Sequence, residues 1–169
     1  EKMNLPSEAL PAIIKGALLH DVGKIGISDT ILLKPGRLDE KEFSIMKQHV
    51  DLGIELIKKI PWCDDALAII ESHHEKFDGS GYPNGLKGEE IPLAARIFAV
   101  VDVFDALTSV RPYKQAFPLK DAMATISEGN GKHFDSAVVT SFIEIAESIW
   151  NDVSDKNTDE LEKLLREVV

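Results

Sequence analysis

Apolar residues recur every three or four positions along most of this chain, which is the spacing typical of amphipathic helices. The clearest run follows Asp39-x-x-Glu42, a helix-capping box, and places Phe43, Met46 and Val50 on one face until Pro61 ends it. Similar patterns predict the other helices. They span residues 4–22 (capped by Asn4 or Ser7), 39–60, 64–75, 92–109, 119–128 and 135–150, followed by an amphipathic segment from Asp155 or Thr158 onward.

One stretch interrupts the helical pattern. Residues 77–88 contain four glycines and one proline, a composition typical of an ordered loop. No segment alternates convincingly as a strand would, and no internal repeat is present. We therefore predict an all-α fold, a bundle of about six to seven helices. The 169 residues are expected to form one domain over residues 1–150, with residues 151–169 as an acidic amphipathic tail.

Composition excludes several classes of protein. The 44% of hydrophobic and 28% of charged residues are ordinary for a soluble globular protein. A net charge of −10 argues against binding to a nucleic acid polymer, which requires a basic face. No apolar stretch reaches the length of a membrane span, and the sequence contains no signal peptide. The single cysteine, Cys63, excludes an internal disulfide and favours a cytoplasmic location.

Metal-binding residue types stand within or at the ends of apolar helical segments. Because an isolated buried charge is costly, carboxylates in such segments are expected to find a cation or a hydrogen-bond donor. The candidates are His20, Asp21, His49, His73, His74 and Asp102. They offer four imidazoles and two carboxylates, a donor set that suits iron, manganese or zinc and fits calcium poorly.

Each candidate also has a simpler interpretation. A His-Asp pair by itself is more typical of a capped helix end, and a single histidine such as His49 on an apolar helix face is more often a core residue. The doublet His73-His74 is harder to explain by packing, since both rings would need polar partners. Asp102 lies in an equally apolar segment, and Asp105 follows one turn later on the same face.

These motifs resemble the HD-GYP family. The resemblance rests on His20-Asp21-x-Gly23-Lys24, on His49, on the eleven-residue motif at 73–83, and on Asp102-x-x-Asp105. It extends from about residue 9 to about residue 147. HD-GYP proteins belong to the HD metal-hydrolase superfamily and degrade the bacterial second messenger cyclic di-GMP. The resemblance therefore implies an HD-domain helical bundle that hydrolyses cyclic di-GMP to pGpG and further to GMP in bacterial signal transduction.

The resemblance implies a role for each matching position. The six candidates named above match ligands of a centre of two or three divalent ions, iron or manganese, in which Asp21 bridges two of them. Lys24 matches a lysine beside the scissile phosphate, and Asp105 matches a carboxylate close to the centre. Asp21, Lys24 and Asp105 are thus the expected catalytic residues. Arg111 and Lys114 match basic residues that, with Lys24, hold the substrate phosphates.

The resemblance also implies partners beyond cyclic di-GMP. A GGDEF-domain protein is expected to contact the Gly81-Tyr82-Pro83 loop, and a sensor or receiver domain is expected upstream. Family members carry a further histidine upstream of the His-Asp pair, whereas residues 1–19 contain none. We therefore expect a domain that lacks its N-terminal helix, fills its metal sites incompletely, has reduced activity and forms a homodimer to cover apolar surface.

Several alternatives stay open at this point. The first is a catalytically impaired HD-GYP module that acts as a cyclic di-GMP sensor or as a docking domain for a GGDEF protein. The second is another HD-superfamily hydrolase acting on ppGpp or deoxynucleotides, which the histidine doublet and the Gly81-Tyr82-Pro83 loop argue against. A structural zinc site is the least consistent, because such sites are usually rich in cysteine.

Overall fold

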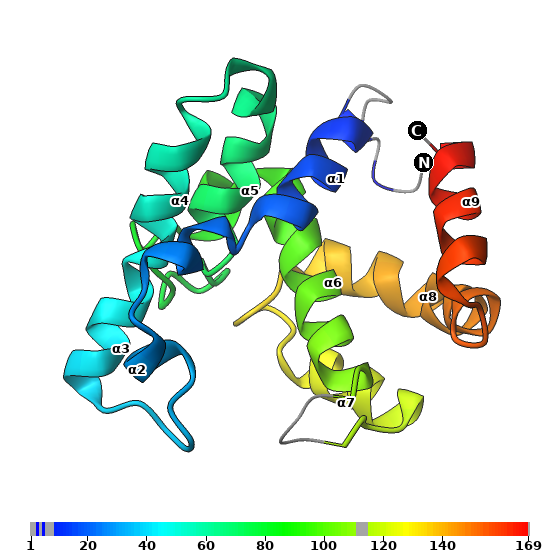
Figure 1. Ribbon diagram of the computed structural model, residues 1–169. Helices are drawn as coiled ribbons and strands as arrows, with labels where there is room; N and C mark the ends of the chain where they lie inside the picture. The colour runs from blue at the N-terminus through cyan, green and yellow to red at the C-terminus, as the bar shows by residue number, and fades with distance from the viewer. Residues whose placement is uncertain (1–2, 4, 6–8, 111–114, 169) are drawn as a thin grey trace.

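The computed structural model describes residues 3, 5, 9–110 and 115–168, without the side chains of residues 165, 167 and 168. The described chain is built from helices, and its only β pairing is an isolated bridge between Asn130 and Phe134 (Figure 1). The prediction of an all-α fold is confirmed. The α-helices are α1 (Ala9–Leu19), α2 (Asp29–Leu32), α3 (Glu40–Lys47), α4 (His49–Ile57), α5 (Leu67–Ser72), α6 (Leu93–Thr108), α7 (Leu119–Glu128), α8 (Ser136–Val153) and α9 (Thr158–Val168).

Helices begin as predicted where the sequence carries a strong start signal. The side chain of Asp39 accepts hydrogen bonds from the backbone nitrogens of Lys41 and Glu42, both at 2.9 Å, and Glu42 accepts one in return from the nitrogen of Asp39. This is the predicted capping box, and α3 follows it directly. Pro92 precedes α6, and the side chain of Asp135 caps α8.

Three predicted helices end early, and each does so beside a candidate ligand. The first ends at Leu19 and not near Val22, so that Asp21 leads into a 3-10 helix at Val22–Gly26. The second, predicted as one helix over residues 39–60, divides at Gln48 into α3 and α4. The third, predicted over residues 64–75, is a 3-10 helix at Pro61–Ala66 followed by α5, which ends at Ser72. These predicted boundaries are wrong.

A close backbone crossing fixes the segment after α1 against α4. A Cβ atom on Gly23 would clash with the carbonyl oxygen of His49 and the amide nitrogen of Gly53. Neither atom belongs to a side chain that could move away, so only glycine fits at position 23. This crossing holds the His20-Asp21 turn next to the start of α4, where His49 lies.

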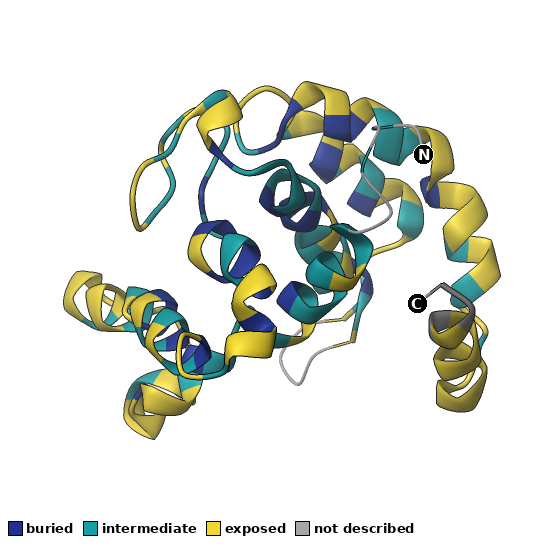
Figure 2. Cartoon of the chain, turned by 90° about the horizontal axis from the view of Figure 1, so that it is seen from above, coloured by how far each residue is buried: buried dark blue, intermediate teal, exposed yellow. Residues whose placement is uncertain are grey.

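The apolar core has two parts, and α6 lies between them (Figure 1). On one side α6 packs against α7 and α8 around Val100, Ile126 and Val139. On the other side it packs against α1 and α5, which belong with α4 to a cluster that includes Ile57 and Ile70. Figure 2 shows the buried residues on the faces that these helices turn toward one another. Asp102 therefore lies on the helix that joins the two halves.

The last helix, α9, extends away from this arrangement. In Figure 1, α9 follows the end of α8 on the side of the molecule opposite to α3 and α4. Leu161 and Leu164 of α9 are exposed. The predicted division into residues 1–150 and a tail over residues 151–169 stays a prediction, and α8 itself runs to Val153. None of the helices in the described ranges is long and apolar enough to cross a membrane.

Candidate metal centre

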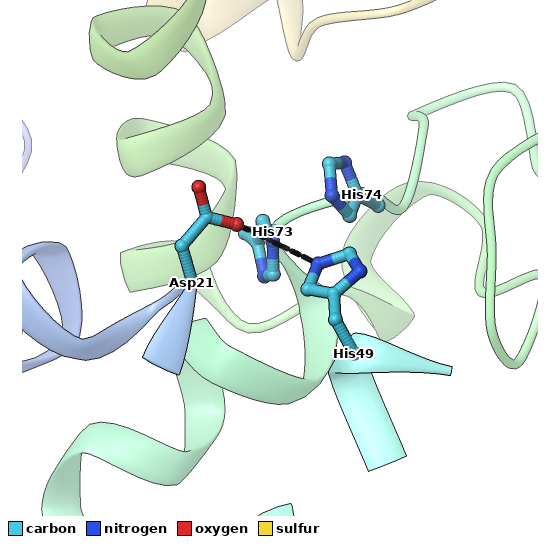
Figure 3. A group of neighbouring side chains, drawn as sticks. All are labelled: Asp21, His49, His73 and His74. Atoms are coloured by element: carbon cyan, nitrogen blue, oxygen red, sulfur yellow. Dashed lines mark hydrogen bonds and ion pairs between the residues drawn. The ribbon is translucent and has the colours of Figure 1, made fainter. Parts of the chain in front are cut away.

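Four candidate ligands from three segments of the chain converge on one point. Ligand atoms of Asp21, His49, His73 and His74 all lie within 4.8 Å of one another (Figure 3). Asp21 comes from the turn after α1, His49 from the start of α4, and the histidine doublet from the turn after α5. His49 and His73 are buried, whereas Asp21 and His74 are partly exposed. The cluster is thus packed against the core and open to solvent on the side of Asp21.

Three imidazoles are oriented by the same kind of hydrogen bond. The Nδ1 atoms of His20, His49 and His73 lie 2.7, 2.7 and 3.0 Å from the carbonyl oxygens of Ala17, Met46 and Ile70, each three residues earlier. A carbonyl oxygen only accepts, so Nδ1 carries the proton in all three rings. The Nε2 atoms of His49 and His73 then turn lone pairs toward the cluster, and Nε2 of His20 faces Oδ2 of Asp21; Nε2 directed at the cluster is the orientation typical of histidine ligands of metals.

The donor atoms fit a divalent cation. Nε2 of His49 lies 3.4 Å from Nε2 of His73, and with both protons on Nδ1 neither atom can donate to the other. Two lone pairs that face each other at this distance repel unless a positive charge lies between them. Imidazole nitrogens and a carboxylate are donors that iron, manganese and zinc accept.

The two oxygens of Asp21 face two different groups of residues. Oδ1 lies 3.6 Å from Nε2 of His49 and 4.0 Å from Nε2 of His73. Oδ2 lies 3.3 Å from Nε2 of His20, whose Nε2 atom is in turn 3.9 Å from Oδ1 of Asp102 on α6. The arrangement therefore offers a first donor group of three histidines and a second group of His20 and Asp102, with Asp21 between them.

Electrostatics keep most of these groups in their ligand forms. Burial opposes the charge on Asp21, but hydrogen bonds from His20 and Lys24 hold the pKa of its carboxyl well below the usual range. Burial and neighbouring imidazoles lower the pKa of His73 to about 4 and that of His74 to about 3. For His20, burial acts to lower the pKa, yet hydrogen bonds to Asp21 and Ala17 raise it overall. At neutral pH the doublet is uncharged beside an ionised carboxylate.

The other predicted site residues lie around the cluster in different ways. Nζ of Lys24 donates to Oδ2 of Asp21 at 2.5 Å, so the predicted lysine is present at the centre. Asp105 is exposed, accepts a hydrogen bond from the hydroxyl of Ser109 at 3.0 Å, and lines an apolar groove between α6 and α8. Its catalytic role stays a prediction. Arg111 and Lys114 lie outside the described residues.

Glu75 has a role that sequence reasoning missed. It is 2% exposed, and its carboxylate accepts hydrogen bonds from the backbone nitrogens of Asn84, Gly85 and Leu86 at 2.7 to 3.1 Å. These bonds fold the glycine-rich loop back over the end of α5. The sequence feature that could have pointed to this role is the position of the glutamate, next to the histidine doublet and directly before the glycine-rich loop. The spacing alone does not show that backbone nitrogens of the loop donate to the glutamate.

The loop in turn covers one of the ligands. The ring of Tyr82 stacks on that of His74, with centroids 4.6 Å apart and planes inclined by 25°. Gly81 passes so close to the backbone of residues 74–76 that a Cβ atom there would clash with it. Burial and the charge of Asp21 raise the pKa of Tyr82 to about 12, so its hydroxyl stays protonated at neutral pH.

Comparison with known proteins gives closely similar relatives. A protein of Vibrio cholerae serotype O1 named cyclic di-GMP phosphodiesterase is 48% identical over 142 residues, which cover 80% of this chain and 29% of that protein. A cyclic di-GMP phosphodiesterase of Thermotoga maritima is 44% identical over 162 residues, covering 95% of this chain and 44% of that protein. The chain thus spans less than half of the length of these relatives.

Two further matches concern a related activity and the fold. A 3'3'-cGAMP-specific phosphodiesterase of Vibrio cholerae is 43% identical over 141 residues, 82% of this chain and 27% of that protein. The crystal structure of a cyclic GMP-AMP specific phosphodiesterase from V. cholerae superposes with a TM-score of 0.70 over 96% of this chain and 44% of that one, at 18% identity. This likeness supports the fold alone. A family model described as HD domain matches residues 1–138. The chain therefore belongs to the HD domain family, as the sequence motifs predict.

Proposed function

We propose that this chain is a metal-dependent phosphodiesterase that hydrolyses cyclic di-GMP to linear pGpG and pGpG further to GMP. The observation that carries the proposal is the convergence of Asp21, His49, His73 and His74 in a chain 48% identical to a cyclic di-GMP phosphodiesterase. Three imidazoles, two of them oriented by hydrogen bonds from Nδ1 to carbonyl oxygens, and one ionised carboxylate form a centre able to hold a hydrolytic metal ion.

The proposed chemistry divides between the metal ions and the residues around them. Bound divalent ions supply a water of lowered pKa and stabilise charge on the phosphoryl oxygens. Asp21 has one oxygen directed at each donor group, which supports its role as the bridging ligand. Lys24, already at Oδ2 of Asp21, would exchange this contact for a phosphoryl oxygen and offset its charge. Asp105 would orient water, and Arg111 and Lys114 would hold the substrate phosphates.

We propose a centre of two or three divalent ions, iron or manganese, and assign ligands to two of them. The first would be held by Asp21, His49, His73 and His74, and the second by Asp21, His20 and Asp102. The support for two sites is the separation of the donor atoms into groups that share only Asp21. The choice of iron or manganese over calcium follows from the excess of imidazole donors.

Cyclic GMP-AMP is a second candidate substrate. The observation in its favour is the 43% identity to a 3'3'-cGAMP-specific phosphodiesterase. The relatives do not favour the alternative of an impaired sensor or docking module, because they are named as phosphodiesterases. A panel of cyclic di-GMP and cyclic GMP-AMP separates the two candidate substrates.

The finer expectations about partners and location are also proposals. The exposed position of Pro83 supports contact between the Gly81-Tyr82-Pro83 loop and a GGDEF-domain protein. Exposed apolar residues of α8 and α9 support a homodimer. A free, buried Cys63 agrees with the cytoplasm. An upstream sensor or receiver domain and a further upstream histidine concern chain outside residues 1–169 and stay predictions.

The test is turnover of cyclic di-GMP by the purified protein loaded with Mn²⁺ or, without oxygen, with Fe²⁺. Asp21→Asn keeps the size of the side chain and removes the charge that two ions would share, so the rate should fall about a hundredfold or more. Circular dichroism should be unchanged, because the side chain of Asp21 is partly exposed. Wild-type turnover and metal content in Asp21→Asn would overturn the bridging role, and no turnover by the metal-loaded wild type would overturn the function.

A further inference from the structure

A polar groove lies beside the metal centre. It encloses about 270 Å³ between the α3–α4 junction and the loop that carries Tyr82. Its lining residues are Ser44, Lys47, Gln48, Asp51, Tyr82 and Pro83. We call it the Tyr82 groove. Gln48 directly precedes His49, and the ring of Tyr82 stacks on that of His74. Two residues that line the groove are therefore next to ligands of the cluster.

One wall of the Tyr82 groove carries a positive charge over aromatic rings. Nζ of Lys47 lies 5.1 Å from the centroid of the Tyr82 ring and 4.9 Å from that of Phe43. These cation–π contacts hold the ammonium group at the groove, where an N–H that points away from the rings can donate to a ligand. The position of Tyr82 is itself fixed by its stacking on His74 and by the bond from its backbone nitrogen to the carbonyl of His74.

The floor of the Tyr82 groove carries polar groups without internal partners. Gln48 and Asp51 are exposed, and in the part of the chain that the structure describes their side chains enter no hydrogen bond or ion pair. Lys47 and Asp51 are four positions apart on almost continuous helical backbone, so a donor and a carboxylate acceptor are neighbours on one face. A ligand that offers an acceptor edge beside a donor edge matches this pair.

We propose that the Tyr82 groove binds the guanine base of the substrate, with Asp51 accepting from N1–H and the 2-amino group and Lys47 donating to O6 and N7. The inference rests on the phosphodiester substrate proposed above, whose scissile phosphate would lie at the metal centre one ribose away. Guanine places two donors next to two acceptors, and a carboxylate can only accept. Adenine places its amino group toward Lys47 and the lone pair of N1 toward Asp51, so the groove selects against it.

The test compares Asp51→Asn with Glu55→Gln. Glu55 is exposed one turn further along α4 and does not line the Tyr82 groove, so Glu55→Gln is the matched control for the loss of one carboxylate. Isothermal titration of the metal-free protein with guanosine and adenosine 5'-monophosphates measures base binding without any turnover. Kinetics with cyclic di-GMP and with bis(p-nitrophenyl) phosphate, a phosphodiester that has no base, separate the groove from the metal chemistry.

The wild type and Glu55→Gln should bind the guanine nucleotide about tenfold more tightly than the adenine nucleotide, and Asp51→Asn should lose this preference. Asp51→Asn should also raise KM for cyclic di-GMP about tenfold and leave kcat and the hydrolysis of bis(p-nitrophenyl) phosphate unchanged. Equal binding of both nucleotides by the wild type would overturn the groove assignment. Failure of the metal-loaded wild type to cleave either phosphodiester would instead overturn the proposed function, and the metal-free titration would still decide the groove.

Discussion

Arg96 and Asp135 form a salt bridge in which Nη1 of Arg96 lies 2.6 Å from Oδ2 of Asp135, and both side chains are largely buried. Nε of Arg96 also donates to the carbonyl of Ile91, and Oδ1 of Asp135 accepts from the nitrogen of Ala137. The pair therefore joins the start of α6 to the start of α8. Because α6 carries Asp102, this pair helps to set the position of a candidate ligand from outside the site.

Arg96→Met should lower the free energy of unfolding by about 3 to 5 kcal/mol, since it leaves the buried carboxylate of Asp135 without its counter-charge. Urea denaturation measures the change. Asp135→Asn in the same background should restore part of the loss, because asparagine still caps α8. Arg166→Met is the control, since the exposed Arg166–Glu162 pair at 4.0 Å should contribute little. Equal effects of Arg96→Met and Arg166→Met would contradict the prediction.

Metal should load in two steps of unequal affinity. The donor group of Asp21, His49, His73 and His74 is complete and tightly gathered, whereas His20 and Asp102 supply fewer atoms to the second position. In a titration of the metal-free protein with Mn²⁺, electron paramagnetic resonance measures the concentration of the free ion. The binding curve should resolve a tight and a weak site. Because the second site has fewer protein ligands, its affinity for Mn²⁺ should be lower than that of the first by at least the 10- to 100-fold typical of the loss of a supporting residue.

Variants assign the two steps. His49→Ala should remove the tight site, and His20→Ala should remove the weak site while leaving the tight one within a few fold of wild type. Loss of the same step in both variants, or two equally tight sites in the wild type, would show that the donor atoms do not form two separate groups.

Gly23→Ala should be more destabilising than Gly16→Ala. A Cβ on Gly23 meets the backbone of His49 and Gly53, which cannot turn aside, whereas the nearest atoms to a Cβ on Gly16 belong to the side chain of Ile69. Overpacking usually costs about 1 to 3 kcal/mol, and we place Gly23→Ala at or above the upper end of that range. Calorimetric melting would show the difference. Mn²⁺ affinity should fall for Gly23→Ala only, because the crossing holds Asp21 against His49.

Glu75→Gln should open the glycine-rich loop. Three backbone nitrogens donate to this buried carboxylate, and an amide group would turn N–H donors toward at least one of them. The expected loss is about 2 to 4 kcal/mol in the free energy of unfolding, with faster amide hydrogen exchange in residues 82–88. Glu71→Gln on the exposed side of α5 should stay within about 0.5 kcal/mol of wild type. Unchanged exchange in Glu75→Gln would mean that other contacts fix the loop.

His133 should make the protein less stable in mild acid. Burial lowers the pKa of its imidazole in the folded state, and the charge of Lys76 adds to this effect. The unfolded chain then binds the proton more readily, so this stabilising contribution is present above the unfolded pKa near 6.5 and is lost as the pH falls toward the folded value. His133→Phe keeps a ring stacked on Phe134 and removes the titration. Its unfolding free energy should depend less steeply on pH between about 7 and 5 than that of the wild type, whereas identical slopes would exclude the effect.

Much of the helical framework could be predicted because end signals and apolar periodicity act locally. Asp39, Pro92 and Asp135 each begin a helix where the sequence places it. The candidate ligands could also be named, because carboxylates and paired imidazoles in apolar segments need polar partners, and because their motifs together resemble those of a known family. The pairing of Oδ1 and Oδ2 of Asp21 with different residues depends on how distant segments cross, which no local pattern contains.

The errors in helix length have a common physical origin. Predicted helices continue past His20, His49 and His73, and the structure ends or interrupts a helix beside each one. At all three positions the imidazole bonds to a carbonyl oxygen in the last turn of the preceding helix. Helix propensity favours a helix that continues past each histidine, but the contacts that the histidine makes with distant segments favour an end or an interruption there. Local rules fail here at the positions that form the candidate metal centre.

Two of these helix ends also have an electrostatic consequence. The C-terminus of an α-helix carries the negative end of the helix dipole, equivalent to roughly half an elementary charge. Because α1 and α5 end at the cluster, two negative ends lie beside it in addition to the carboxylates of Asp21 and Asp102, whereas the negative end of α3 is offset by the positive end of α4, which begins at His49. The backbone itself thereby supplies part of the field that favours a doubly charged cation there, in a chain of ordinary composition.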